Sequence, residues 1–141
     1  MNVLYTATAH ATGDGRNGHA RSDDGYIDLD LRVPPEMGGP GGATNPEELF
    51  AAGYAACFGG ALDFVAHSHK KDAAKATITC SVSIGPRDGG GFGLAVNMSV
   101  VDPGLPQAEL EAFVKEAHEH VCPYSHATRD NIPITFEVKG G

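Results

Sequence analysis

The sequence is poor in cysteine and in basic residues, and its uncharged run, residues 49–62, is short for a membrane span. Its three cysteines are an odd number at long spacings, which argues against the disulfide framework of a small secreted domain. Ten Lys and Arg against eighteen Asp and Glu leave a net charge of −8, which repels nucleic-acid phosphates and anionic lipid surfaces. We therefore expect neither a nucleic acid nor a membrane as a partner.

Targeting signals are also missing. The start, MNVLYTATAH, lacks the basic region, apolar run and small-residue cleavage site of a signal peptide, so we expect a cytoplasmic protein. Residues 49–62 carry no charge, but this stretch contains three glycines and falls short of the roughly eighteen apolar residues of a membrane span. It is expected to be a buried core helix.

The hydrophobic pattern predicts an α+β fold. A length of 141 residues suits one domain with its own core, covering residues 1–141. Alternation predicts strands and 3.6-residue spacing predicts helices, in the order strands, long helix, strands, helix, strand. The strands are expected within residues 2–12, 19–33, 76–85, 91–101 and 131–140, and the helices within 45–67 and 108–121.

Local composition refines this order. The first strands are apolar on one face only, which predicts a half-exposed sheet. Residues 34–44, PPEMGGPGGAT, predict a loop of the kind that often edges a pocket. The strands within 76–85 and 91–101 are expected to form an antiparallel hairpin, and Pro133 places the last strand at a sheet edge.

The long helix has the clearest start. Asn45 suits the N-cap, Pro46 the first helical position and Glu48 the third, which is a capping-box pattern. The stretch that follows is apolar on two faces, so we expect protein to surround the helix. Gly53 and Gly60 each cost about 1 kcal/mol relative to alanine inside a helix, so we expect a second helix to pack closely there.

The three cysteines have different surroundings. Cys80 occupies an inward position of a regular strand and is expected to be core. Cys122 precedes Pro123 and should end the second helix, in an accessible turn where the helix dipole disfavours a thiolate. Cys57 lies in the uncharged helix, where lost solvation raises a thiol pKa above about 8.5 unless a cation is near. Cys57 is therefore an inert core residue, or a nucleophile that needs a cation.

Three segments together resemble the organic hydroperoxide resistance (Ohr) branch of the Ohr/OsmC family. They are GDGRNGHARSDDG, NPEELFAAGYAACF and VCPYSHATRDNI, and the resemblance covers essentially the whole chain. It implies an OsmC-like fold, with antiparallel sheets packed around a long buried central helix, in an intertwined homodimer with active sites at the subunit interface. It also implies a thiol-dependent peroxidase with no bound cofactor, which a lipoylated protein or dihydrolipoamide reduces.

The resemblance also implies roles for individual residues. The peroxidatic cysteine falls on Cys57 and the resolving cysteine on Cys122, while Arg16 is the activating arginine and Glu47 the carboxylate that orients it. Arg16 would favour a Cys57 thiolate, which attacks the peroxide, becomes a sulfenic acid and forms a disulfide with Cys122. The apolar surface for an organic hydroperoxide is expected from Phe50, Tyr54, Phe58, Met37, Gly38 and Gly39.

Helix geometry adds a constraint on this assignment. Glu47 and Cys57 are ten residues apart, which is about 15 Å along a helix axis and roughly 80° around it. One arginine can hardly bridge that span within a chain. Arg16 and Glu47 are therefore expected to meet the partner subunit's Cys57.

Four histidines and a neighbouring pair of charged residues are expected to have structural roles. His118 and His120 point about 200° apart on a helix and make a poor chelate, so these residues, like His67 and His69, are expected on the solvated surface. No metal site is predicted. Arg129 and Asp130 are expected to form a surface or capping pair.

Two functional alternatives remain beside the Ohr-type peroxidase. One is an OsmC-type relative with broader peroxide use, against which the segments VCPYSHAT and GRNG argue. The other is a non-enzymatic thiol redox switch, or an apolar-ligand binding protein, with the same fold. Catalytic turnover with a dithiol excludes the redox switch and the binding protein, and a strong preference for organic hydroperoxides over hydrogen peroxide excludes the OsmC-type relative.

Overall fold

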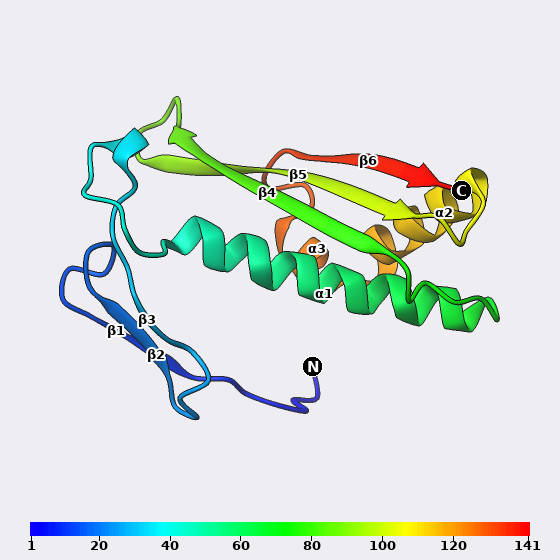
Figure 1. Cartoon of the computed structure of the whole chain (residues 1–141), viewed down its shortest axis with the longest axis horizontal. Coiled ribbons are helices and arrows are strands. Elements are labelled where there is room, and N and C mark those ends of the chain that lie inside the picture. The colour runs from blue at the N-terminus through cyan, green and yellow to red at the C-terminus, as the bar shows by residue number, and fades with distance from the viewer. The chain divides into compact units, whose positions relative to one another are not determined.

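A computed structural model describes all 141 residues, which form two compact units, Met1–Leu49 and Phe50–Gly141 (Figure 1). Each unit has its own three-stranded sheet. The α+β class expected from the sequence is confirmed. One domain over residues 1–141 stays a prediction, and each unit is described separately.

The first unit contains an antiparallel sheet in the order β1-β2-β3. The strands are β1 (Ala9–Thr12), β2 (His19–Ser22) and β3 (Asp28–Asp30), so the predicted first strand begins later than its pattern suggested. The prediction of a half-exposed sheet is wrong in the single chain, because every residue of β1 and β3 is exposed, on both faces. Leu31 is buried, whereas Ile27 and Leu29 on the same predicted face are 42% and 39% exposed.

A glycine-rich loop follows this sheet, as predicted. It contains the 3-10 turn η1 (Pro35–Met37), and Gly38 closes that turn with a φ of 84°. At Gly39 a Cβ would lie 2.1 Å from the carbonyl oxygen of Val33, so no larger residue fits there. The loop therefore needs glycine for both backbone conformation and space.

The long helix α1 (Pro46–Ser68) begins where the capping pattern predicted. Asn45 Oδ1 accepts the backbone N–H of Glu48 at 2.9 Å, and Asn45 Nδ2 donates to Glu48 Oε1 at 3.0 Å. This reciprocal contact satisfies one of the free N–H groups at the helix start. By length and composition alone α1 qualifies as a membrane span, but a core helix passes the same test.

Within one chain, other parts of the protein cover only one face of α1. The expectation of a helix surrounded by protein is therefore wrong for the single chain. The face with Tyr54, Phe58, Leu62 and Val65 is fully buried. The opposite stripe is exposed, and Phe64 there is 65% exposed; the stripe consists of Ala52, Ala56, Gly60 and Phe64. In the second unit the helix therefore contributes one buried and one bare apolar face.

The two glycines of α1 have different neighbours. A Cβ at Gly53 would lie 3.1 Å from the hydroxyl of Tyr124, so a side chain of the short helix α3 (Pro123–Thr128) makes the close approach there. A Cβ at Gly60 would meet nothing within 4 Å. A second helix therefore does approach α1 closely at Gly53, through a side chain and not through its backbone. At Gly60 the predicted contact is absent.

The second sheet has the order β4-β5-β6. β4 (Thr77–Pro86) and β5 (Phe92–Asp102) form the predicted antiparallel hairpin, and β6 (Ile134–Gly140) is an edge strand as Pro133 suggested. However, β6 runs parallel to β5, so the expectation of purely antiparallel sheets is wrong here. Between these strands the chain passes through α2 (Gln107–Glu116) and α3, which form the crossover connection that a parallel pair requires.

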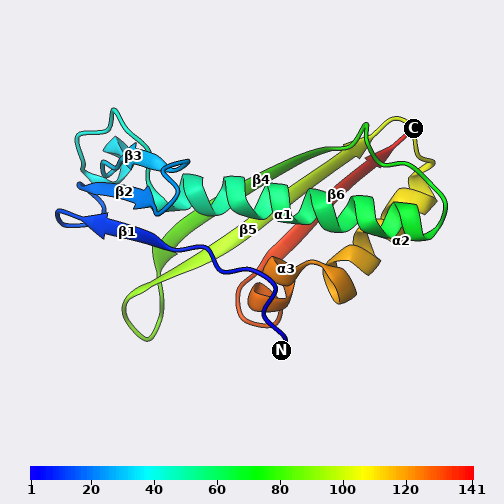
Figure 2. The ribbon, with the colours of Figure 1, turned by 90° about the horizontal axis from the view of Figure 1, so that it is seen from below.

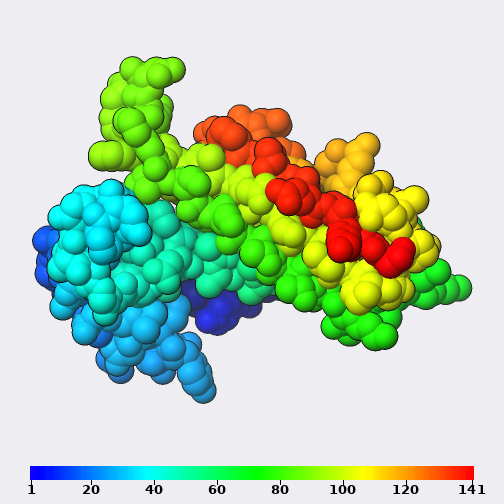
Figure 3. Space-filling model, turned by 45° about the horizontal axis from the view of Figure 1, so that its top comes forward, coloured from blue at the N-terminus to red at the C-terminus, as the bar shows by residue number.

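The helices of the second unit lie on one face of this sheet (Figures 1 and 2). Their buried faces and the inward residues of β5 form one hydrophobic cluster, in which Tyr54, Phe58, Met98 and Leu110 have no exposed surface. The tip of the β4–β5 hairpin stands clear of the rest of the unit (Figure 3). The sheet thus supports the helices that carry Cys57 and Cys122.

The predicted helix over residues 108–121 is divided. It consists of α2 (Gln107–Glu116) and a π-helical turn, η2 (Ala117–Val121), and it is followed by a short helix, α3 (Pro123–Thr128). A π turn inserts an extra residue into helical backbone and often marks a functional site. The segment expected as a turn after Cys122 is therefore a helix.

Candidate thiol site

Two of the three cysteines lie side by side in the second unit. Cys57 Sγ on α1 and Cys122 Sγ between η2 and α3 are 3.7 Å apart, and both thiols are reduced. A disulfide bond is about 2.05 Å long, so a shift of less than 2 Å would join the two sulfurs. Contact between residues 65 positions apart is the central feature of this site.

Burial and hydrogen bonding act in opposite directions on Cys57. Its side chain is half-buried against the hydrophobic cluster, and this burial is the main cause of the raised pKa of the thiol. The nearby backbone N–H of Tyr124 lowers the pKa of this thiol, while the adjacent Cys122 raises it. The raised pKa agrees with the prediction that Cys57 needs a cation to react as a thiolate.

Cys122 differs from its prediction in two respects. It is 2% exposed and therefore not accessible. It also caps the start of α3, where its sulfur accepts the backbone N–H of Ser125 at 3.4 Å. The prediction used only the helix that ends before Cys122, and it did not anticipate the helix that begins after it.

Cys80 lies in β4 opposite Met98 and packs against the same hydrophobic cluster, as predicted for a core residue. Its pKa is raised by burial alone. The structure gives its side chain no hydrogen-bond partner and no neighbouring thiol, in contrast to Cys57.

Arg16 and Glu47 form a paired contact within the first unit. Arg16 Nη1 donates to Glu47 Oε2 at 2.9 Å, and Arg16 Nη2 donates to Glu47 Oε1 at 2.6 Å. This contact stabilises the ionised carboxylate of Glu47 and so holds the pKa of Glu47 below its usual value. The same contact raises the pKa of Arg16. A bidentate pair fixes the guanidinium plane and leaves its remaining N–H groups available.

The residues predicted to contact substrate have different positions. Tyr54 and Phe58 are fully buried core residues, and the ring of Phe58 packs 5.4 Å from that of Phe136. Phe50 is half-buried, and its ring lies 6.2 Å from Tyr54 and 6.3 Å from Tyr124. In the first unit, Met37, Gly38 and Gly39 lie in the exposed loop around η1.

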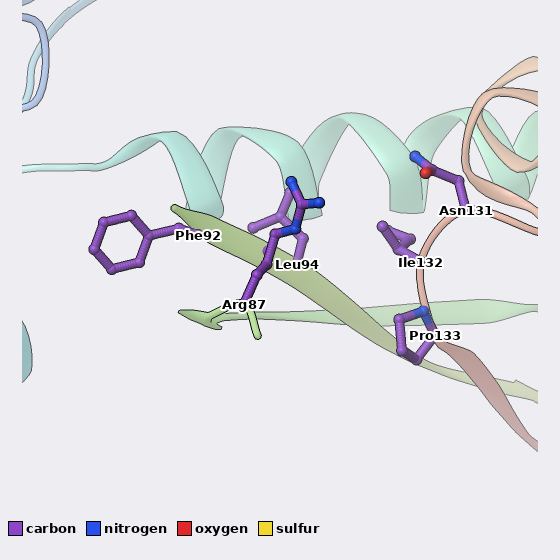
Figure 4. A pocket seen from close by; sticks show the side chains of 7 residues that line it. Arg87, Phe92, Leu94, Asn131, Ile132 and Pro133 are labelled. Atoms are coloured by element: carbon purple, nitrogen blue, oxygen red, sulfur yellow. The ribbon is translucent and has the colours of Figure 1, made fainter. Parts of the chain in front are cut away.

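A cavity of about 420 Å³ opens between the β4–β5 hairpin and the segment after α3. Figure 4 shows the guanidinium of Arg87 and the amide of Asn131 extending in the same direction beside apolar side chains. The remaining lining residues are Phe92, Gly93, Leu94, Ile132 and Pro133. Sequence reasoning did not find this cavity because its walls come from segments about 40 residues apart.

A buried group of polar side chains lies next to the two thiols and was also missed. Tyr54 OH is 2.9 Å from Ser125 Oγ and 3.1 Å from Thr128 Oγ1. His118 Nδ1 is 2.9 Å from Ser125 Oγ. A tyrosine in the middle of an apolar helix face gave a weak signal for such a group, because a buried phenol usually needs a hydrogen-bond partner.

His118 is therefore not the solvated residue predicted. It is half-buried, its ring lies edge-on to Phe136, and burial followed by the charge of Arg129 lowers its pKa, against weaker opposing effects of Glu119 and Asp130. Arg129 Nη1 donates to the backbone carbonyl of His118 at 2.7 Å. Arg129 is also the C-cap residue of α3 and Asp130 follows it with a φ of 62°, so the two residues take the predicted capping position.

The other three histidines predicted on the surface, His67, His69 and His120, are exposed. His67 contacts Asp63, His69 contacts Glu116, and His120 lies near Glu119. No group of three or more His, Cys, Asp or Glu side chains is arranged to hold a metal ion.

Comparisons with known proteins agree on one family. The family model of OsmC-like proteins matches residues 39–137. The chain is 53% identical over 138 residues to the organic hydroperoxide resistance protein of Xanthomonas axonopodis pv. citri, covering 96% of this chain and 95% of that one.

Solved structures of organic hydroperoxide resistance proteins confirm the predicted OsmC-like fold. The protein from Legionella pneumophila has a TM-score of 0.92 at 48% identity, covering 98% of this chain and 99% of that one. The protein from Elizabethkingia anophelis has a TM-score of 0.93 at 45% identity, with both chains fully covered. The chain therefore belongs to the OsmC-like family, in its organic hydroperoxide resistance (Ohr) branch.

Proposed function

We propose that this protein is a thiol-dependent peroxidase that reduces organic hydroperoxides, including lipid hydroperoxides, to alcohols. The observation that carries the proposal is the 3.7 Å separation of Cys57 Sγ and Cys122 Sγ. Two thiols in contact on a fixed scaffold are suited to pass through a disulfide and back. The names of the Ohr relatives support the class of substrate.

The proposed reaction has two balanced steps on the enzyme. The Cys57 thiolate attacks one peroxide oxygen, the O–O bond breaks, and the second oxygen leaves as an alcohol after taking a proton; Cys57 is then a sulfenic acid. Cys122 attacks the Cys57 sulfur, an S–S bond forms, and water leaves. The disulfide protects Cys57 from further oxidation to the sulfinic acid.

Arg16 is the proposed cation for the first step. Burial raises the pKa of Cys57, so a permanently charged guanidinium beside the sulfur would restore the thiolate. Glu47 would hold Arg16 in position through the bidentate contact. We propose that a homodimer forms the complete site at its interface, where Arg16 and Glu47 of one chain meet the partner subunit's Cys57.

An apolar surface would give preference for organic over inorganic peroxide. Phe50 and the loop of Met37, Gly38 and Gly39 have exposed surface for a hydrocarbon tail, whereas Tyr54 and Phe58 would support it from within the core. Hydrogen peroxide gains no binding energy from such a surface.

The disulfide must be reduced for turnover, and we propose a lipoyl-type dithiol as the donor. One donor thiol would attack a sulfur of the Cys57–Cys122 disulfide, and the second would close the donor's own disulfide, leaving both protein thiols reduced. A flexible dithiol arm suits a site whose resolving sulfur is buried. The cytoplasm, where thiols are kept reduced, is the proposed compartment.

Steady-state kinetics test this proposal. Dihydrolipoamide would be the reductant, and linoleic acid hydroperoxide, tert-butyl hydroperoxide and hydrogen peroxide the oxidants. We expect multiple turnovers with both organic substrates and a much lower kcat/KM for hydrogen peroxide. If the Cys57–Cys122 disulfide forms but no turnover occurs, the protein is a redox switch and the proposal is wrong.

A further inference from the structure

Four hydrogen bonds run in series beside the two thiols of the second unit. They connect His118 Nδ1 to Ser125 Oγ at 2.9 Å, Ser125 Oγ to Tyr54 OH at 2.9 Å, and Tyr54 OH to Thr128 Oγ1 at 3.1 Å. The last connects Thr128 Oγ1 to the backbone carbonyl of Tyr124 at 2.8 Å. We call this series the His118 chain. Ser125 and Tyr54 have no exposed surface, and Thr128 is 6% exposed.

The final acceptor fixes the direction of every proton in the chain. A carbonyl oxygen only accepts, so the Thr128 hydroxyl must donate to Tyr124. Tyr54 must then donate to Thr128 Oγ1, and Ser125 must donate to Tyr54 OH. Ser125 Oγ has no further proton to give, so His118 must donate from Nδ1. The network thereby assigns the Nδ1–H tautomer to neutral His118.

The His118 chain holds the part of α3 that contacts both sulfurs. Ser125, in the middle of the chain, donates its backbone N–H to Cys122 Sγ at 3.4 Å. The backbone N–H of Tyr124, at the end of the chain, lies close enough to Cys57 to lower the pKa of its thiol. These two consecutive N–H groups are in turn connected to α1 through Tyr54 and to the π turn through His118.

We propose that His118 is a positioning residue for the resolving step, because it holds Ser125, and through it Cys122, in line with Cys57. This inference rests on the proposed thiol peroxidase function. The Ser125 N–H donates to the Cys122 sulfur and holds it in position as this sulfur attacks the Cys57 sulfenic acid, forming the S–S bond while water leaves. His118 itself does not touch the reacting atoms.

The π turn explains how His118 reaches Ser125. A π turn changes the direction of the side chains that follow α2, and Arg129 holds the turn by donating to the His118 carbonyl at 2.7 Å. The imidazole packs against Phe136 of β6, with ring centroids 4.9 Å apart. The ring is therefore fixed from the sheet, from α3 and from its own backbone.

Two nearly isosteric substitutions separate the donor from the volume of the side chain. His118→Asn keeps an N–H donor at the δ position, whereas His118→Leu has the same shape as asparagine without the donor. Each reduced variant is mixed with one equivalent of tert-butyl hydroperoxide, quenched with dimedone and N-ethylmaleimide at increasing times, and analysed by mass spectrometry. The yields of Cys57 sulfenic acid and Cys57–Cys122 disulfide are read separately.

We expect His118→Leu to slow disulfide formation about tenfold or more, because a small misplacement of a reacting group has effects of this size. Formation of the sulfenic acid should be unchanged, so this species accumulates. His118→Asn should stay within about twofold of wild type because the donor is kept. Thermal unfolding of both variants controls for general loss of structure, which would slow both steps.

A spectroscopic measurement checks the chain without any turnover. Nitrogen-15 NMR of reduced wild-type protein at neutral pH should show the Nδ1–H tautomer of His118, with slow exchange of this proton. A dominant Nε2–H tautomer would overturn the assigned direction of the chain. If His118→Leu forms the disulfide as fast as wild type, the positioning role is wrong; if wild type forms no sulfenic acid, the proposed function itself fails and the inference with it.

Discussion

Cys57 and Cys80 are both half-buried thiols that pack against the same hydrophobic cluster, and burial raises the pKa of both. Around Cys80, which lies opposite Met98, burial is the only influence on the pKa of the thiol. Around Cys57 a second thiol lies 3.7 Å away and a backbone N–H lies close to the sulfur. The comparison teaches that burial alone does not identify a reactive cysteine; the groups brought to it do.

The largest expected effect on activity comes from replacing Cys57, the thiol that has a reactive neighbour. Cys57→Ser replaces the nucleophilic sulfur by a hydroxyl that is not ionised at neutral pH, so kcat/KM for an organic hydroperoxide should fall on the order of 10³-fold or more. Steady-state turnover with dihydrolipoamide measures this loss. Retention of substantial activity would show that Cys57 is not the nucleophile.

The next effect separates the two thiols of the pair. Cys122→Ser should still reduce about one equivalent of hydroperoxide per chain, because Cys57 is intact, but multiple turnovers through the disulfide should stop. Under excess peroxide we expect Cys57 to proceed to the sulfinic acid. Mass spectrometry of Cys57 checks this, and formation of a Cys57–Cys80 disulfide in its place would contradict the assignment of Cys80 as core.

A third prediction concerns the cation that Cys80 lacks. Arg16→Lys keeps the charge but loses the planar pair of N–H groups, and we expect kcat/KM to fall about 10²-fold, comparable to the loss of one preorganised donor. Glu47→Gln should cost about tenfold, because it only orients Arg16. Absorbance of the thiolate at 240 nm during a pH titration should show a higher pKa for Cys57 in both variants. An unchanged titration would mean that Arg16 does not act on this sulfur.

Features that depend on short stretches of sequence were predictable, because neighbouring residues alone determine them. The start of α1 at Pro46 follows from its capping residues, and the core position of Cys80 follows from strand alternation. The bidentate pairing of Arg16 with Glu47 followed from the resemblance to the Ohr branch.

The features that sequence reasoning missed depend on long-range packing. The π turn before Cys122 has no local pattern that distinguishes it from the end of α2, so the buried state of Cys122 and the role of His118 were not visible. The parallel pairing of β6 with β5 and the bare stripe of α1 likewise depend on how distant segments meet. A pattern shows which residues are apolar, but it does not show which neighbour covers them.

The smallest effect belongs to Cys80, the matched control for Cys57. Cys80→Ser should leave kcat/KM unchanged and lower the free energy of unfolding by about 1 kcal/mol, because a hydroxyl without a partner replaces a sulfur in the core.

The pH dependence of the free energy of unfolding supplies a sharper readout for Cys80. A thiol with a raised folded-state pKa contributes stability that is complete below its unfolded pKa of about 8.5 and is lost as pH rises through the folded value. Wild-type stability should therefore decline more steeply above that pH than the stability of Cys80→Ser, as measured by urea unfolding between neutral and alkaline pH. Equal slopes would show that Cys80 does not keep its proton in the folded core.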